Sequence, residues 1–488
     1  MPELKTARRG GVLAAVTMVT AVTLSGLSAP AQAADQATPG ARSIGDRLFA
    51  YLGNGGYEVE SYDVSFDYQP GTTAMKSSVQ IKATATQALS EFSLDSAAQK
   101  ITSVSVDGQP AEFRLKDEKL IVTPKHALPK GQTFQVDIAY VADRTARPVS
   151  PADPNNPLHV DYWYNKDDGF ALFGQPDRAH VFFPMNDHPR DKARVTFRIT
   201  TPSDLQAVAN GTLQSRTTHG DRATYVYSTR DPIATQVVQA AVGHFKELRQ
   251  TGPHNLPLRS FVTPDLYDKA EPQLKLIPGQ LEWVENKIGS RYPFETYGVL
   301  GVKGGYAAAL ETATLSTFSA EAGLTKPSEV PTMLHELVHQ YFGNAVSEKN
   351  WDDMWLSEGH ASYYTFLYKA EKGYSEGGTF EDDIKRTYEY DKETRPQSGP
   401  PGRLKNAMEV LGSTNAGGVL MLHGLHLKVG DAVFQKIEHT FFDRFRHKAA
   451  TTQDYIDVAN EVSGHDYTGY IKSWIYGAQT PEMPTRSN

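Results

Sequence analysis

Residues 333–344 read Met-Leu-His-Glu-Leu-Val-His-Gln-Tyr-Phe-Gly-Asn and contain a His-Glu-x-x-His pattern, formed by His335, Glu336 and His339. Apolar residues surround the pattern at helical spacing: Leu334, Leu337, Val338 and Tyr341. On a helix, side chains four positions apart lie on the same face, so both imidazoles can point toward one metal ion. Glu336 lies beside that position, where a general base for metal-assisted hydrolysis belongs. The stretch therefore predicts a helix that holds a zinc ion.

A catalytic zinc ion usually has three protein ligands and one open position, so two histidines leave the predicted site one ligand short. The sequence offers Glu358, with 18 residues between it and His339. We expect residues 347–351 to form a loop, and Asp352 or Asp353 to cap a second helix that carries Glu358. Two antiparallel helices would then bring Glu358 to both histidines and complete a His-His-Glu site for one zinc ion per chain. The alternative is that the histidines only pack in the core of an amphipathic helix.

The first 33 residues have the pattern of a secretory signal peptide. Basic residues precede an apolar run over residues 12–27, and Ala31-Gln32-Ala33 matches a signal-peptidase site. We therefore expect removal of residues 1–33, a mature chain that begins at Ala34, and a secreted, extracellular protein. Residues 34–54 are mostly polar and small, which predicts a flexible lead-in. An uncleaved N-terminal membrane anchor is the alternative.

The composition narrows the class of protein. With 488 residues the chain is expected to form two or three domains, and 39% hydrophobic and 22% charged residues are ordinary for a globular protein. The net charge of −8 and the lack of a basic block argue against nucleic acid as a partner. The absence of cysteine excludes disulfides, thiol catalysis and cysteine-ligated zinc. No second apolar span is present, so we expect release without membrane attachment after signal removal. We also expect a monomer.

Short alternating segments predict many strands between residues 55 and 246. They are 59–68, 79–83, 101–106, 120–122, 134–141, 195–199, 207–209, 223–228 and 236–242. Their close spacing predicts an antiparallel β-sandwich or saddle. Further along, strands are expected at 258–262, 297–302 and 310–317, and an amphipathic helix at 274–288, before the two zinc-binding helices. We thus predict an α+β chain with an N-terminal β domain (55–246), a catalytic domain (247–480) and a tail (481–488).

The zinc motif and its surroundings, HELVHQYFGN and WLSEGHASY, resemble the M1 family of zinc aminopeptidases. The resemblance implies an N-terminal β domain followed by a thermolysin-like α/β catalytic domain, in a short form without the large C-terminal helical domain of many members. It implies a secreted zinc metallopeptidase that removes N-terminal residues from peptide substrates. By the same resemblance, His335, His339 and Glu358 bind zinc. Glu336 takes the proton from the zinc-bound water that attacks the peptide.

Residues 308–312 match the family's Gly-x-Met-Glu-Asn strand, of which only Glu311 is retained. The resemblance implies that Glu311 binds the free amine of the substrate. It also implies that Ala308 and Ala309 run alongside the peptide as an edge strand, through backbone hydrogen bonds that the altered side chains leave intact. The alternative for Glu311 is an exposed carboxylate on an edge strand.

Two positions depart from the family pattern. The second amine anchor, which precedes the run Phe-Pro-Met-Asn-Asp-His-Pro at residues 183–189, is the neutral Gln175; the alternative is that Gln175 is a plain loop residue. The family's tyrosine, which donates to the oxyanion, is replaced by Asn415, whose shorter amide is also a donor. Gln175 favours one alternative function, a gluzincin endopeptidase. Asn415 favours another, a weakly active, zinc-loaded peptide-binding protein.

Overall fold

A computed structural model of the chain describes residues 36–152, 162–166, 169–304, 309–375 and 378–484. Ala308, the predicted signal peptide and its cleavage site lie outside these residues. From Ala37 onward the chain forms one compact unit. Strands come first along it and helices later, which confirms the predicted α+β class. The domain boundaries at residues 34, 55, 247 and 481 stay predictions.

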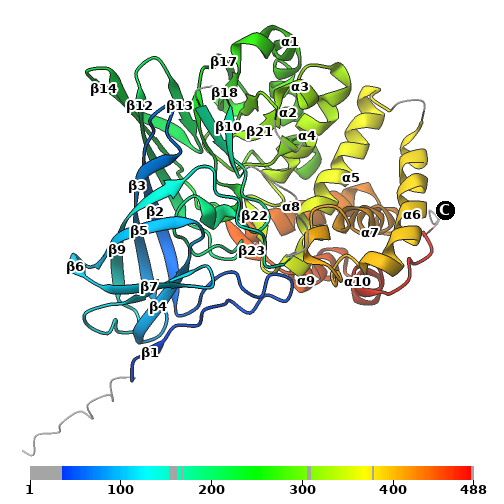
Figure 1. Cartoon of the computed structure of the whole chain (residues 1–488). Coiled ribbons are helices and arrows are strands. Elements are labelled where there is room, and N and C mark those ends of the chain that lie inside the picture. The colour runs from blue at the N-terminus through cyan, green and yellow to red at the C-terminus, as the bar shows by residue number, and fades with distance from the viewer. Residues whose placement is uncertain (1–35, 153–161, 167–168, 305–308, 376–377, 485–488) are drawn as a thin grey trace, which may run out of the picture. The chain divides into compact units, whose positions relative to one another are not determined.

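The largest sheet has eight strands, most of which alternate buried and exposed residues. In β2 (Tyr57–Asp67), for example, Tyr62, Val64 and Phe66 are buried between partly exposed neighbours, so one face of the sheet packs on the core. In spatial order the strands are β14 (Thr212–His219), β15 (Arg222–Ser228), β12 (Arg194–Pro202), β2, β3 (Ala74–Ala85), β9 (Thr133–Asp143), β5 (Gln99–Val106) and β6 (Gln109–Pro110). All of them except β15 are labelled in Figure 1. The predicted antiparallel sheet is wrong at one pair, because β12 runs parallel to β2. These strands are far apart in sequence, and no hairpin turn forces them to run in opposite directions.

Two four-stranded sheets complete the β-rich part. The first has the order β1 (Thr38–Pro39), β4 (Leu89–Asp95), β8 (Lys119–Thr123) and β7 (Glu112–Lys116). The second has the order β10 (Trp163–Lys166), β11 (Gly169–Leu172), β16 (Ala240–Gly243) and β13 (Gln206–Ala209). The strand predicted over residues 236–242 is wrong at its start, where Thr235–Val237 forms a 3-10 helix. There Val237 O accepts a hydrogen bond from Ala313 N at 2.9 Å, so this segment bonds to a later loop and not to a neighbouring strand.

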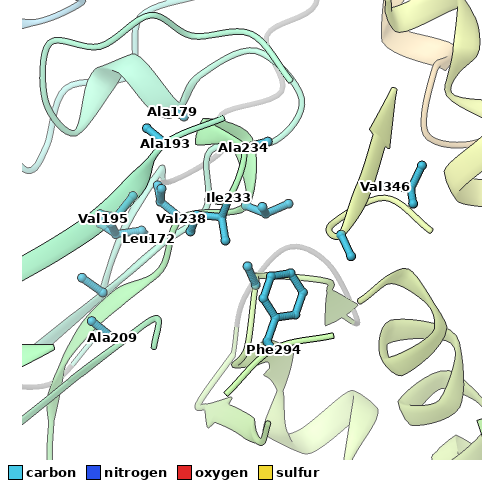
Figure 2. Packing of buried hydrophobic residues seen from close by; sticks show 14 of the residues in the cluster. Leu172, Ala179, Ala193, Val195, Ala209, Ile233, Ala234, Val238, Phe294 and Val346 are labelled. Carbon is cyan, nitrogen blue, oxygen red and sulfur yellow. The ribbon is translucent and has the colours of Figure 1, made fainter. Parts of the chain in front are cut away.

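Apolar residues from distant parts of the sequence share one core cluster. Figure 2 shows members of this cluster, including Val195 of β12, Ala209 of β13 and Ile233, together with Phe294 and Val346 from the later part of the chain. Burial of these side chains is favourable because it removes apolar surface from water. Hydrophobic packing therefore joins the β-rich part to the segment that follows the zinc motif.

A mixed five-stranded sheet begins at Lys246. Its order is β17 (Lys246–Thr251), β18 (Pro257–Val262), β19 (Val299–Val302), β21 (Ser316–Ser319) and β20 (Ala309–Leu310). The helix predicted over residues 274–288 is present as α2 (Ile277–Ile288), and α1 (Pro264–Leu274) precedes it. α2 begins three residues later than predicted, because Pro278 has no N–H for the preceding turn and so starts a new helix. The strand predicted over residues 310–317 is wrong in its middle. Thr314 has a left-handed backbone (φ 63°) and Leu315 N bonds to Thr312 O, so the chain turns between β20 and β21.

The rest of the described chain is mostly helical. The two helices predicted to carry the zinc motif are present as α4 (Val330–His339) and α5 (Trp355–Lys372). The other helices are α3 (Ala320–Gly323), α6 (Phe380–Ser398), α7 (Thr414–Val429), α8 (Asp431–Phe445), α9 (Thr452–Ser463) and α10 (Thr468–Tyr476) (Figure 1). Among the described residues, no helix is both long and apolar enough to cross a membrane.

The connection between α4 and α5 differs from the predicted loop. Its residues Val346–Glu348 form β22, which pairs in parallel with β23 (Lys448–Ala450). A 3-10 helix (Trp351–Asp353) follows, and neither predicted aspartate caps α5. Asp353 instead accepts hydrogen bonds from the backbone N–H and the hydroxyl of Thr452, both at 2.8 Å. The start of α5 is therefore held by contacts with the C-terminal helices and not by a local cap.

Candidate active site

His335 and His339 lie one turn apart on α4, and Glu358 lies in the first turn of α5. The two Nε2 atoms are 3.0 Å apart, and Glu358 Oε2 lies 3.6 Å from His335 Nε2 and 3.8 Å from His339 Nε2. Ligand atoms of a tetrahedral zinc ion are ~3.3 Å apart when the metal–ligand bonds are about 2.0–2.1 Å long. The three atoms therefore surround a point that a zinc ion fits, which is the chemistry expected of this donor set.

A second layer of contacts orients the ring of His339. Its Nδ1 lies 2.9 Å from Ser357 Oγ and 3.3 Å from Phe342 O, and the Ser357 hydroxyl itself donates to Phe342 O at 3.2 Å. A partner for Nδ1–H leaves Nε2 free for a metal. Gly343 makes room for the serine, because its φ is 123° and a Cβ atom there would lie 2.4 Å from Ser357 Oγ.

Electrostatics distinguish the two imidazoles. Burial by itself lowers the pKa of His335, but the hydrogen bond with Glu358 and the charge of Glu336 outweigh burial and raise the pKa to about 9. Burial and the positive charge of His335 lower the pKa of His339 to about 4. His339 is therefore neutral at pH 7 and ready to bind a metal, whereas His335 must release a proton first.

Glu336 is buried beside the His-His-Glu set without belonging to it. One carboxylate oxygen each of Glu336 and Glu311 and one ring nitrogen of His339 lie within 4.8 Å of one another. Burial raises the pKa of Glu336 well above its ordinary value; His335 opposes this shift, and the charge of Glu311 adds to it. A carboxyl group with a raised proton affinity suits a base that takes a proton and later returns it.

Gln175 and Glu311, far apart in the sequence, meet at the site. Gln175 Nε2 donates to Glu311 Oε1 at 2.6 Å, and both side chains are buried. Burial raises the pKa of Glu311, and the hydrogen bond from Gln175 opposes this shift. Glu311 is thus not the exposed edge carboxylate of the alternative interpretation. It is grouped with Glu336 and His339, because one possible ligand atom of each lies within 4.8 Å of the others.

Ala309 lies on β20, at the edge of its sheet. β20 pairs with β21 alone among the described strands, with Ala309 opposite Phe318 and Leu310 opposite Thr317. Its outer edge therefore offers backbone groups to which an extended peptide can add as a further strand. Ala308, for which the same role was predicted, lies outside the described residues.

Asn415 lies in the first turn of α7 and is partly exposed. α7 crosses α5 where Gly418 meets Gly359, and a Cβ atom on Gly418 would lie 2.8 Å from Gly359 Cα. One turn before this crossing, Asn415 lines a cavity of about 390 Å³ together with Ser362. Ser362 is one turn after Glu358 on α5, but Glu358, His335 and His339 are not among the residues that line this cavity.

Three buried polar residues near the site were not predicted from the sequence: Ser357, Gln340 and Asn344. Gln340 Nε2 and Asn344 Nδ2 both donate to the backbone carbonyl of Glu311. The sequence does contain a signal for them. Gln340 and Asn344 are amides among the apolar residues that surround the zinc motif, and a buried amide needs hydrogen-bond partners.

Comparison with protein families and solved structures gives consistent results. Residues 58–236 match the Peptidase M1 N-terminal domain, and residues 273–474 match the Peptidase family M1 domain. Among solved structures, the chain is similar to a mutant M1 zinc metallopeptidase from Deinococcus radiodurans bound to a Tyr-Ser-Ala substrate. The TM-score is 0.80 and the identity 26%, over 91% of this chain and 100% of that one.

The curated relatives are much longer than this chain. The chain is 21% identical to probable aminopeptidase 2 of Sulfurisphaera tokodaii over 408 residues. This alignment covers 79% of this chain and 49% of that protein. It is 25% identical over 318 residues to glutamyl aminopeptidase of Sus scrofa, which covers 62% of this chain and 34% of that protein. The chain thus spans about half the length of the first relative and about a third of the second.

Proposed function

The chain belongs to peptidase family M1, and from this premise we propose that it is a zinc-dependent aminopeptidase that removes residues from the N-termini of peptides. The observation that carries the proposal is the position of Glu311 beside the metal cluster. Its carboxylate lies within 4.8 Å of a carboxylate oxygen of Glu336 and a ring nitrogen of His339. One residue spans at most about 3.3–3.6 Å of extended chain, so an amine bound by Glu311 leaves room for a single residue before the reacting carbonyl.

His335, His339 and Glu358 are the residues that would hold the metal ion, one per chain. When bound, zinc supplies Lewis acidity and makes a water molecule nucleophilic near neutral pH. The chain orients the ligands, because Ser357 and Phe342 O fix the ring of His339.

Glu336 is the general base in this proposal. Its carboxylate takes a proton from the attacking water, holds it while the peptide bond breaks, and delivers it to the leaving amine. Burial favours the protonated carboxyl, which helps Glu336 to hold the proton between the two transfers. The two histidines would take no part in proton transfer, since their Nε2 lone pairs would bind the metal.

Glu311 and Gln175 would bind the substrate ammonium together. Gln175 uses its N–H₂ group to hold Glu311, so its amide oxygen remains as a neutral acceptor beside the charged one. A charged acceptor makes a stronger hydrogen bond to an ammonium than a neutral one does. The buried pair therefore favours an aminopeptidase over the endopeptidase alternative, which needs no amine anchor.

A second candidate function rests on Asn415. If this residue replaces the oxyanion donor, the chain is a zinc-loaded peptide-binding protein with little turnover. Tyr390 of α6 lines the same cavity as Asn415 and is 52% exposed, so a phenol is present beside Asn415. Glu336 favours the enzyme, because a pure binding protein has no need of a buried base beside the metal.

Hydrolysis of two matched peptides tests the proposal. Zinc-loaded protein is given Tyr-Ser-Ala and N-acetyl-Tyr-Ser-Ala, with Glu336→Gln as the blank. Release of the first residue from the free peptide alone is the result expected of an aminopeptidase. Cleavage of both peptides would support an endopeptidase. If one zinc ion is bound and a varied set of peptides gives no turnover above the blank, the result would support the peptide-binding protein instead.

Export and assembly are part of the proposal. The pattern of residues 1–33 supports a secreted protein that loses this segment and acts on extracellular peptides. N-terminal sequencing of protein from the culture medium should begin at Ala34, and a start at Met1 would contradict export by cleavage. We also propose that the protein has no nucleic-acid or membrane partner and that it is a monomer. Light scattering of the mature chain would check the oligomeric state.

A further inference from the structure

The segment that carries Glu311 has little local support. Within the described residues, β20, which precedes it, is two residues long, and the chain turns immediately afterwards. In that turn Thr312 N bonds to Leu310 O at 2.9 Å and Leu315 N bonds to Thr312 O at 3.2 Å. A turn of this kind does not by itself define where the Glu311 side chain stands relative to another element. Contacts from elsewhere must therefore hold it.

Two amide side chains supply these contacts. Asn344 Nδ2 donates to the Glu311 backbone carbonyl at 2.6 Å, and Gln340 Nε2 donates to the same oxygen at 3.1 Å. A carbonyl oxygen has two lone pairs, so both are satisfied by side chains. Gln340 also accepts a hydrogen bond from Thr314 N at 2.8 Å and thus holds both sides of the turn. Gln340 and Asn344 are fully buried.

Both amides belong to the end of the zinc helix. Gln340 follows His339 directly and is one turn after Glu336. Asn344 N bonds to His339 O at 2.9 Å, and Asn344 O accepts from Lys192 Nζ at 2.6 Å. The carbonyl of Glu311 is therefore tied to the same stretch of backbone that places the metal ligand and the general base.

We propose that Gln340 and Asn344 are positioning residues that set the distance between the amine anchor Glu311 and the metal cluster. This inference rests on the proposed aminopeptidase function. An extended chain advances about 3.3–3.6 Å per residue, so the anchor must be held to well within that distance to select the first peptide bond. Loss of either amide should weaken recognition of the free amine and leave the remainder of peptide binding intact.

Peptide affinity in the absence of turnover tests the inference. Zinc-loaded Glu336→Gln protein is titrated calorimetrically with Tyr-Ser-Ala and with N-acetyl-Tyr-Ser-Ala. The affinity for the free peptide divided by the affinity for the acetylated peptide measures the contribution of the amine. The same measurement is made after adding Gln340→Met or Asn344→Leu. Each change should lower the ratio about ten-fold, since a buried carbonyl loses a donor and the Glu311 segment is released. The affinity for the acetylated peptide should stay unchanged.

Gln280→Met is the matched control. Gln280 of α2 is also a buried amide, and its Nε2 donates to Val330 O at the start of the zinc helix at 3.0 Å, without reaching the Glu311 segment. Its affinity ratio should equal that of the Glu336→Gln parent. Thermal unfolding shows which variants fold. If Asn344→Leu does not fold, Asn344→Ala replaces it as a milder change.

The outcomes separate the inference from the proposed function. An unchanged ratio in folded Gln340 and Asn344 variants would overturn the inference, as would an equal loss in the Gln280 control. A parent that shows no preference for the free amine would overturn it as well, because Glu311 would then not be an anchor. Failure of turnover in the otherwise unmodified chain, with the amine preference present, would contradict the enzyme and leave the inference standing.

Discussion

Ser357→Ala is expected to weaken zinc binding about ten-fold although the three proposed ligands, His335, His339 and Glu358, are unchanged. The Ser357 hydroxyl is the nearer of two acceptors for the Nδ1 proton of His339, at 2.9 Å against 3.3 Å for Phe342 O. The hydroxyl also donates to Phe342 O and so fixes its own orientation. Its removal leaves the His339 ring with one longer hydrogen bond.

The magnitude follows from these two contacts. A neutral hydrogen bond contributes about 0.5–1.5 kcal/mol, and 1.4 kcal/mol corresponds to a ten-fold change in Kd. Removing an outer partner of a metal-binding histidine typically lowers metal affinity by ~10–100-fold. Because Phe342 O still accepts the Nδ1 proton, we expect a loss at the lower end of that range.

Competition with a chromophoric chelator at neutral pH measures the zinc affinity directly, without reference to activity. Thr365→Val is the matched control, because Thr365 lies on the same helix and its hydroxyl donates only to Ala361 O, at 2.7 Å. Circular dichroism of the metal-free proteins verifies the fold. An unchanged zinc affinity in Ser357→Ala, or an equal loss in Thr365→Val, would refute the role of Ser357.

Three further predictions concern the oxyanion, the β-rich part and the helix crossing. Asn415→Tyr should raise kcat by up to ~10²–10³-fold at constant zinc content, because it would restore the phenol donor of the family; an unchanged kcat would mean that Asn415 is not the replaced position. His180 is buried, which by itself lowers its pKa, but Asp187 and Glu118 raise it to about 9. This folded pKa lies above the unfolded value of about 6.5, so the stabilisation by His180 is fully present below pH ~6.5 and is lost as the pH rises through about 9. Urea unfolding should therefore show that His180→Gln costs most in mildly acidic buffer and least in alkaline buffer, and a cost that grows with pH would contradict the assignment. Gly418→Ala places a Cβ atom 2.8 Å from Gly359 Cα and should destabilise the fold by ~1–3 kcal/mol in urea unfolding, whereas Gly412→Ala, with its nearest contact at 4.0 Å, should cost much less.

Several elements could be predicted from local pattern alone. Alternation of apolar and polar residues located β2, β3, β9 and β12 because one face of their sheet is buried. The same reasoning failed over residues 310–317, where apolar and β-branched residues suggested a continuous strand. Thr314 takes a left-handed backbone there, and hydrogen bonds from Gly211 N to Thr314 Oγ1 and from Ala313 N to Val237 O hold the turn. These partners are distant in sequence, so no local pattern reveals them.

The site divides in the same way. The pairing of His335 with His339 follows from the helical repeat, and Glu336 follows from its neighbours. The position of Glu358 near the histidines depends on how α5 packs. Asp352 and Asp353, which were predicted to cap α5, lie in a 3-10 helix and do not cap it. The connection between α4 and α5 instead contains β22, which pairs in parallel with β23 from the C-terminal part of the chain.

The sequence by itself determined the ligand type, the helical spacing of the two histidines and the buried faces of the major strands, because these depend on residues that are neighbours along a helix or strand. Tertiary structure alone decided that Gln175 donates a hydrogen bond to Glu311, that Gln340 and Asn344 donate to the Glu311 carbonyl, and that α7 packs against α5 at Gly359. Each of these contacts joins separate segments of the chain. Such contacts depend on the packing of whole elements and on the satisfaction of buried polar groups, which a one-dimensional pattern does not specify.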